Sequence, residues 1–271
     1  MNTNIRPFGD QIPTLPPVPA LPPPKMENIG GSMASLFVTA MEGYKGDFNG
    51  DGLQLSEGPI EPDDEVPSDP ERDAAEAKLR NSAEFQKLPR TVRDTAFMSR
   101  KEAISWAKAL DNGLKIQVVA NTQSGNAATY DPSTKTIYLK QSYVDAASGE
   151  EYYGYNSGLL LGSLVHELGH HLTLGQISVD PTTRANYIDG NLTIEAAAIV
   201  NNLITYHLLG HQGYDVFVGG GNVNNVFFTF YEQFIGDNNI DSLINKIKSQ
   251  LLINGTYPDY YGQYWDQYLK P

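Results

Sequence analysis

Two histidines four residues apart, with a glutamate beside the first, are the strongest chemical signal in the chain. Residues 166–170 read His-Glu-Leu-Gly-His and lie inside an apolar run over 159–174. On a helix, residues four apart lie one turn apart on the same face, so both imidazoles can bind one metal ion. Glu167 is then placed to take a proton from a water molecule. The motif predicts a catalytic zinc site rather than two hydrogen-bonded core histidines.

Such a site needs a third protein ligand. Catalytic zinc takes three side chains and leaves a fourth position for water. The chain has no cysteine, so the ligand must be His, Asp or Glu. Glu195 is the favoured candidate, because it lies near the start of a helix expected over 191–209 and is followed by three alanines that let two helices approach closely. Asp189 and Asp180 are the alternatives.

This arrangement resembles that of the gluzincins, zinc peptidases in which HExxH on one helix is completed by a glutamate on a following helix, often as ExxA or ExxxD. Glu195 and Ala198 match ExxA, whereas Ile199 stands where the ExxxD subset has its aspartate. The resemblance covers residues 159–209 and the preceding strand. The supporting carboxylate of that subset is therefore absent or comes from another position, such as Asp189 or Asp215.

A metzincin-type site is excluded by two positions after the motif. That class has a glycine and a further ligand where this chain has Thr173 and Gln176. His171 points about 100 degrees away from His170 on a helix. We therefore interpret His171 as an exposed or packing residue rather than a ligand.

The gluzincin resemblance implies a zinc-dependent endopeptidase that acts on a peptide or protein substrate, with Glu167 as general base and then general acid. In these enzymes a Tyr or His stabilises the developing oxyanion. We favour His211, because it follows Gly210 at the expected end of the 191–209 helix, where a loop can fold it back over the zinc. The candidates for this role are Tyr187, His207, His211 and Tyr214.

The predicted fold is α+β and zincin-like, a mostly helical catalytic domain over 67–271 with a small antiparallel sheet. Strands are expected over 115–120 and 134–140, and the second should be an edge strand that precedes the HExxH helix and holds an extended substrate by strand addition. Thr91 and Ser99 are expected helix N-caps. Helices are expected over 156–174, 191–209, 224–235 and 240–252.

The N-terminal quarter of the chain has a different composition. Residues 1–31 are expected to be a disordered tail, because the proline-rich stretch over 13–24 favours extended polyproline II. That stretch could bind a partner that recognises proline motifs, and a spacer or export segment is the alternative. Residues 32–66 are expected to form a helix, an EF-hand-like loop and an acidic linker.

The EF-hand-like loop raises the question of calcium. Asp47, Asn49 and Asp51 occupy loop positions one, three and five, and a glycine follows at position six. Position twelve, which normally carries a bidentate carboxylate, is Gly58, and Glu57 lies one residue early. Calcium binding by Asp47, Asn49, Asp51 and Glu57 and an ordinary Asn/Asp/Gly turn are therefore both open.

The net charge of -13 and the lack of any Lys/Arg cluster argue against a nucleic-acid partner. We find no apolar run of the length that spans a bilayer, and the first residues lack the features of a signal peptide. Secretion without a cleavable signal is the favoured expectation, and a cytoplasmic location is the alternative.

Three functions are therefore compared. The leading one is an exported bacterial zinc endopeptidase, a protease, toxin or effector. The second is an intracellular regulatory peptidase that resembles the ImmA/IrrE family, whose HELGH helix and following Glu-Ala-rich helix are similar to residues 161–171 and 194–203. The third is a metal-binding module without turnover, against which the intact Glu167 argues, because a structural zinc site needs no base.

Overall fold

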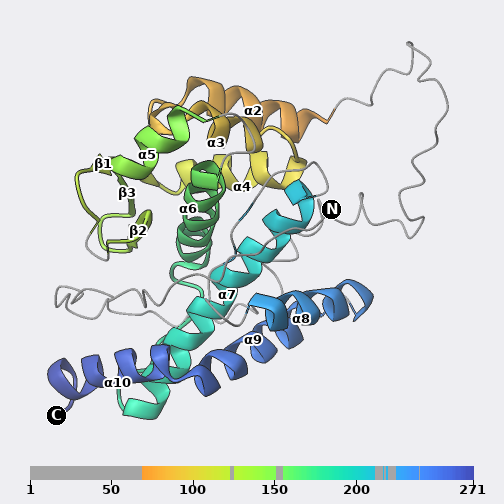
Figure 1. The fold of residues 1–271 in the computed structure, drawn as a ribbon. Helices are drawn as coiled ribbons and strands as arrows, with labels where there is room; N and C mark the ends of the chain where they lie inside the picture. The colour runs from red at the N-terminus through yellow and green to blue at the C-terminus, as the bar shows by residue number, and fades with distance from the viewer. Residues whose placement is uncertain are drawn as a thin grey trace.

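The computed structural model describes residues 69–122, 125–150, 155–210, 216, 218, 224–237 and 239–271. Several predictions lie outside these ranges: the proline-rich stretch, the EF-hand-like loop with Asp47, Asn49, Asp51 and Glu57, and the residues His211, Tyr214 and Asp215. The described part of the chain is mostly helical with one small sheet, which confirms the α+β class (Figure 1). Its elements are α2 Pro70–Asn81, η1 Phe85–Lys87, α3 Arg90–Thr95, α4 Arg100–Asp111, β1 Lys115–Val119, β2 Ala128–Asp131, β3 Thr136–Lys140, α5 Gln141–Ser148, α6 Tyr155–Thr173, α7 Arg184–Gly210, α8 Asn224–Asp237, α9 Ile240–Asn254 and α10 Thr256–Tyr268.

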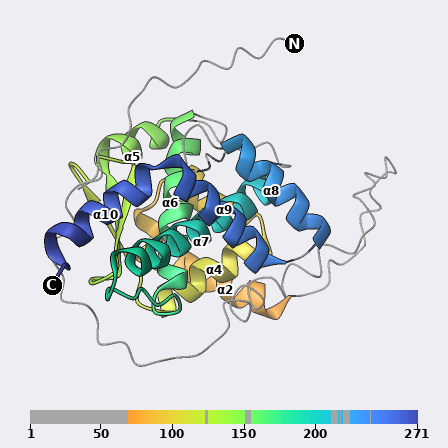
Figure 2. The ribbon, with the colours of Figure 1, turned by 90° about the horizontal axis from the view of Figure 1, so that it is seen from below.

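Two hydrophobic cores lie on either side of the α6–α7 contact. The first core joins the sheet to α2, α4, α5 and α6, and Phe85, Ile137 and Leu164 are fully buried in it. The second joins α7 to α8, α9 and α10, with Leu203 and Phe227 fully buried. Figure 2, turned to show the molecule from below, has α9 and α10 lying over α7. The HExxH helix therefore belongs to one core, and the helix that carries Glu195 belongs to the other.

The sheet differs from the prediction in two respects. Its strand order is β1-β3-β2, with β1 parallel and β2 antiparallel to β3, so the sheet is mixed rather than antiparallel. The arm predicted over 134–140 contains β3, the central strand, so its prediction as an edge strand was wrong. The antiparallel pairing of β2 with β3 agrees with the predicted type of sheet, but the parallel pairing of β1 with β3 depends on a tertiary contact that the strand pattern does not contain.

The two outer edges of the sheet are different. At β1, the Ile116 N–H donates to Glu84 Oε2 (2.7 Å), and Lys87 Nζ donates to the Ile116 carbonyl (2.8 Å). Glu84 and Lys87 also pair with each other at 2.7 Å. These side chains cover part of the β1 edge, as is common for strands that must not pair with another chain. At the other side of the sheet, β2 packs against α6.

Local sequence signals account for several helix ends. Ser99 Oγ accepts the Glu102 N–H at 3.0 Å, which confirms the predicted N-cap of α4. Thr91 was the wrong cap, because α3 begins at Arg90 after Pro89. The helix predicted over 191–209 begins earlier, at Arg184. Within the described residues, the segment Arg184–Leu209 of α7 is long and apolar enough to cross a membrane, but 72% of its most apolar window is buried in the protein, as for a central core helix.

A buried polar network ties α4 to α7 and α6. Lys101 Nζ lies 2.8 Å from Glu102 Oε1 and 2.9 Å from Asn201 Oδ1. Thr205 Oγ1 donates to the same Glu102 oxygen at 2.6 Å, and Asn201 Nδ2 donates to the Val165 carbonyl at 2.8 Å. Because Val165 belongs to α6, this network holds α6, the helix of the HExxH motif, against its neighbours.

We predict that Lys101→Met lowers the free energy of unfolding by about 3 to 5 kcal/mol, because it leaves the Glu102 carboxylate buried without its cation. The side chains of this pair are 6% and 2% exposed. The matched control is Lys78→Ala, which breaks the Lys78–Asp111 pair, whose side chains are 40% and 61% exposed, and should cost less than about 1 kcal/mol. Urea unfolding measures both, and equal losses would contradict the prediction.

Candidate metal centre

Three side chains from two helices converge at one point. His166 and His170 extend from α6 and Glu195 from α7. The two Nε2 atoms lie 3.2 Å apart, and Glu195 Oε2 lies 3.4 Å from the first and 3.7 Å from the second. The predicted set is therefore brought together as expected, and the third member is Glu195.

The spacing of the three atoms can be compared with what zinc requires. The circle through them has a radius of about 2.0 Å, and zinc binds His nitrogen and carboxylate oxygen at roughly 2.0 to 2.2 Å. At such bond lengths a tetrahedral ion has ligand atoms about 3.3 to 3.6 Å apart, close to the three observed distances. Two imidazoles and one carboxylate form a donor set that suits zinc and leaves a fourth position for water. These residues therefore fit a catalytic zinc ion.

The protonation states of His170 and Glu195 also suit a cation. Burial lowers the pKa of His170 to about 4, which keeps its ligand nitrogen unprotonated. Burial alone raises the pKa of Glu195, but the neighbouring His170 and His166 and a hydrogen bond from Tyr261 outweigh it and hold this pKa at about 2. For His166, burial lowers the pKa, and the Glu195 contact together with the charges of Glu167 and Glu195 reverses the shift. A charged carboxylate beside imidazoles is what a divalent ion needs.

Close packing of α6 on α7 makes this convergence possible. A Cβ built on Gly169 lies only 2.8 Å from the Ala198 Cα and 3.2 Å from the Asn201 Cβ, so no larger side chain fits without moving a helix. Ala196, Ala197 and Ala198 are all fully buried. The expectation that small residues beside Glu195 let the helices approach is confirmed.

A tyrosine that the sequence reasoning missed supports the carboxylate. The Tyr261 hydroxyl, on α10, donates to Glu195 Oε1 at 2.6 Å, while Oε2 is the oxygen that faces the histidines. Tyr257 lies one turn earlier, and its ring stacks on that of Tyr261 at 6.4 Å. Burial raises the pKa of Tyr257, and the charges of Glu195 and Glu167 raise it further, so its hydroxyl lies in the field of both carboxylates. The only sequence signal was the density of tyrosine in the C-terminal segment.

Glu167 lies between the histidine pair and the sheet. Its Oε2 accepts the Tyr130 N–H from β2 at 2.9 Å. Burial raises its pKa to about 7, with a further rise from the Glu195 charge, while the nearby His166 and the Tyr130 N–H oppose the shift. A carboxyl group that titrates near neutral pH can both accept and donate a proton, which is what the predicted role of Glu167 requires.

The alternative ligands and donors lie elsewhere. Asp189 forms an ion pair with Lys248 at 2.9 Å, and Asp180 bonds the Thr182 N–H and the Asn186 side chain. The structure brings neither of them into the cluster of His166, His170 and Glu195. Of the proposed oxyanion donors, Tyr187 stacks on Tyr264 at 6.0 Å, and His207 packs on Tyr231 at 5.6 Å. The favoured donor, His211, lies outside the described residues.

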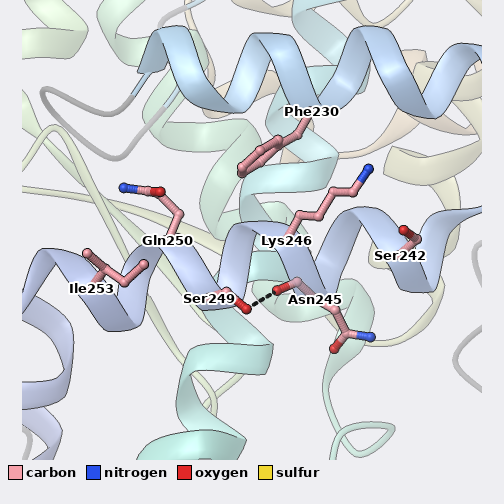
Figure 3. A pocket seen from close by; sticks show the side chains of 7 residues that line it. All are labelled: Phe230, Ser242, Asn245, Lys246, Ser249, Gln250 and Ile253. Carbon is pink, nitrogen blue, oxygen red and sulfur yellow. Dashed lines mark hydrogen bonds between the residues drawn. The ribbon is translucent and has the colours of Figure 1, made fainter.

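The surface hollow between α8 and α9 is a separate feature. Figure 3 shows its walls, which come from these two helices and contain none of the metal-ligand candidates. Its volume is about 480 Å³. The lining residues are Phe230, Ser242, Asn245, Lys246, Ser249, Gln250 and Ile253. None of these lining residues is His, Asp or Glu, so the hollow offers no imidazole or carboxylate ligand for a metal ion.

Comparison with known proteins adds no relative. The chain matches no protein-family model, no curated protein and no solved structure. The resemblance to gluzincins therefore depends on the motif residues themselves.

We predict that Tyr261→Phe weakens zinc binding about 10- to 100-fold, because the hydrogen bond that orients Glu195 is lost. The matched control is Tyr264→Phe on the same helix, whose ring stacks on Tyr187 and which should bind zinc like the unchanged protein. Competition with a chromogenic chelator measures both affinities. Equal affinities for the two variants would contradict the support assigned to Tyr261.

Proposed function

We propose that this protein is a zinc-dependent endopeptidase with a zincin-like catalytic domain of the gluzincin type. One observation carries the proposal. The ligand atoms of His166, His170 and Glu195 surround a single point, and the buried carboxyl group of Glu167 lies beside it, held by the sheet. A purely structural site would close the fourth position and would have no use for a buried base.

The residues have separate tasks in this proposal. His166, His170 and Glu195 hold the zinc, which when bound polarises the scissile carbonyl and lowers the pKa of water. Glu167 takes the proton of the attacking water and then passes it to the leaving nitrogen. Burial, which brings its pKa to about 7, lets it perform both transfers near neutral pH.

The substrate is proposed to lie along β2 rather than along the arm predicted from the sequence. Lys140 N–H donates to the Ala127 carbonyl, so the alternation of an antiparallel pair turns the backbone groups of Ala128 and Tyr130 to the outer edge. Tyr130 is the residue whose N–H bonds Glu167. An extended peptide that adds a strand beside β2 therefore passes directly in front of the base.

Tyr257 is proposed to stabilise the developing oxyanion. It lies on the same face of α10 as Tyr261, one turn away, and Tyr261 already contacts Glu195. A phenol whose pKa is raised stays protonated and can donate a hydrogen bond throughout the reaction. This assignment takes the role that the sequence interpretation gave to His211.

We predict that Glu167→Gln lowers hydrolysis of unfolded casein by about 10²- to 10⁴-fold while zinc stays bound, because only the proton carrier is lost. Glu232→Gln, an exposed position on α8, is the control and should keep full activity. A chelator should abolish the activity of the unchanged protein, and added zinc should restore it. Zinc bound at one ion per chain without any casein hydrolysis would favour the non-catalytic metal-binding module instead.

We predict that Tyr257→Phe lowers kcat by about 10²- to 10³-fold with little change in KM or zinc affinity, because the hydroxyl acts on the transition state. Tyr268→Phe, at the exposed end of α10, is the matched control. Steady-state kinetics on a fluorogenic peptide distinguishes the two variants. If kcat is the same in both, Tyr257 is not the donor.

A further inference from the structure

Tyr130 of β2 contacts α6 at two points that lie one helical turn apart. Its backbone N–H donates to Glu167 Oε2 at 2.9 Å, and its hydroxyl lies 2.9 Å from His171 Nδ1. Glu167 and His171 are four residues apart on α6, so they lie on one face of that helix. The single strand residue therefore spans one turn of α6, with the general base at one end and His171 at the other.

His171 is itself anchored. Its Nε2 lies 3.1 Å from the carbonyl oxygen of Ala109, near the end of α4, and the side chain is buried at 4% exposure. A carbonyl oxygen only accepts, so Nε2 carries the proton. A neutral imidazole with its proton on Nε2 has a free lone pair on Nδ1, so Nδ1 accepts the hydrogen bond of the Tyr130 hydroxyl. The direction of every hydrogen bond from Ala109 to Glu167 is therefore determined.

We propose that His171 and Tyr130 form a clamp that positions Glu167, and we call these two residues the β2–α6 clamp. His171 was interpreted from the sequence as an exposed or packing residue; it is buried and holds Tyr130. This proposal rests on the proposed function in one respect: it takes Glu167 as the general base that must be oriented.

The clamp has two physical effects on the site. The Tyr130 N–H orients one carboxylate oxygen of Glu167, and a carboxylate that is held in place does not have to be reoriented during the reaction. The Tyr130–His171 contact, with the rings edge-to-face at 5.5 Å, holds β2 at a fixed height on α6. If that contact is removed, the strand can shift along the helix, and the N–H no longer points at Glu167.

The first test is spectroscopic and needs no activity. In the zinc-loaded, uniformly ¹⁵N-labelled full chain, the amide proton at position 130 should resonate downfield, because it bonds a carboxylate. Glu167→Gln should move this resonance upfield, and His171→Leu should move it in the same direction. His207→Leu, which removes a histidine that packs on Tyr231 in the second core, is the control and should leave it unchanged.

The second test is kinetic. His171→Leu and Tyr130→Phe should each lower kcat about 10- to 100-fold, with KM and zinc affinity unchanged, and the double variant should lose no more than the single ones. His171→Asn should recover part of kcat, because its side-chain oxygen can accept the Tyr130 hydroxyl. Tyr130→Phe changes only one oxygen atom, so it provides a result even if His171→Leu folds poorly.

Each outcome supports or overturns the proposal that the β2–α6 clamp positions Glu167. An unmoved resonance in His171→Leu overturns the clamp, and so does a moved resonance with unchanged kcat. If the unchanged protein binds zinc but hydrolyses nothing, the proposed function fails, and the resonance at position 130 alone decides whether His171 and Tyr130 position Glu167.

Discussion

The structure depends on the direct contact between α6 and α7 at Gly169 and Ala198. A Cβ on Gly169 would clash with the backbone of Ala198, so the two helix backbones are in direct contact beside His166, His170 and Glu195. Asn201, one turn after Ala198, bonds the Val165 carbonyl on α6 and so continues the same contact. The contact joins two hydrophobic cores and at the same time places a glutamate from one of them against two histidines from the other.

That placement buries negative charge, which a bound cation would compensate. Glu195 is held ionised among side chains that exclude water, Glu167 lies close by, and burial keeps the proton off His170. Buried charge without a counter-ion is costly. A divalent ion would compensate this charge and would bind the unprotonated nitrogen of His170. The Tyr261 hydroxyl donates to Glu195 and the Tyr130 N–H donates to Glu167, while Tyr257 lies in the field of both carboxylates.

The motif and the helix that carries it could be predicted because their signals are local. The spacing of His166 and His170 and the ExxA pattern at Glu195 require only helical periodicity. Tyr261 and Tyr130 could not be assigned, since they lie 66 and 37 residues from the carboxylates that they contact. The early start of α7 could not be predicted either, because it also depends on contacts between residues distant in the sequence. Gly190 looks like a loop residue, but a Cβ there would lie 3.0 Å from the Val179 backbone, so tertiary packing selects glycine inside the helix.

The position of zinc in crystals of the metal-loaded chain, located by anomalous scattering at the zinc edge, tests the proposed site directly. We predict one strong peak at roughly 2.0 to 2.2 Å from Nε2 of His166, Nε2 of His170 and Oε2 of Glu195. A peak bound by other residues, or one that leaves Glu195 out of the coordination, would contradict it.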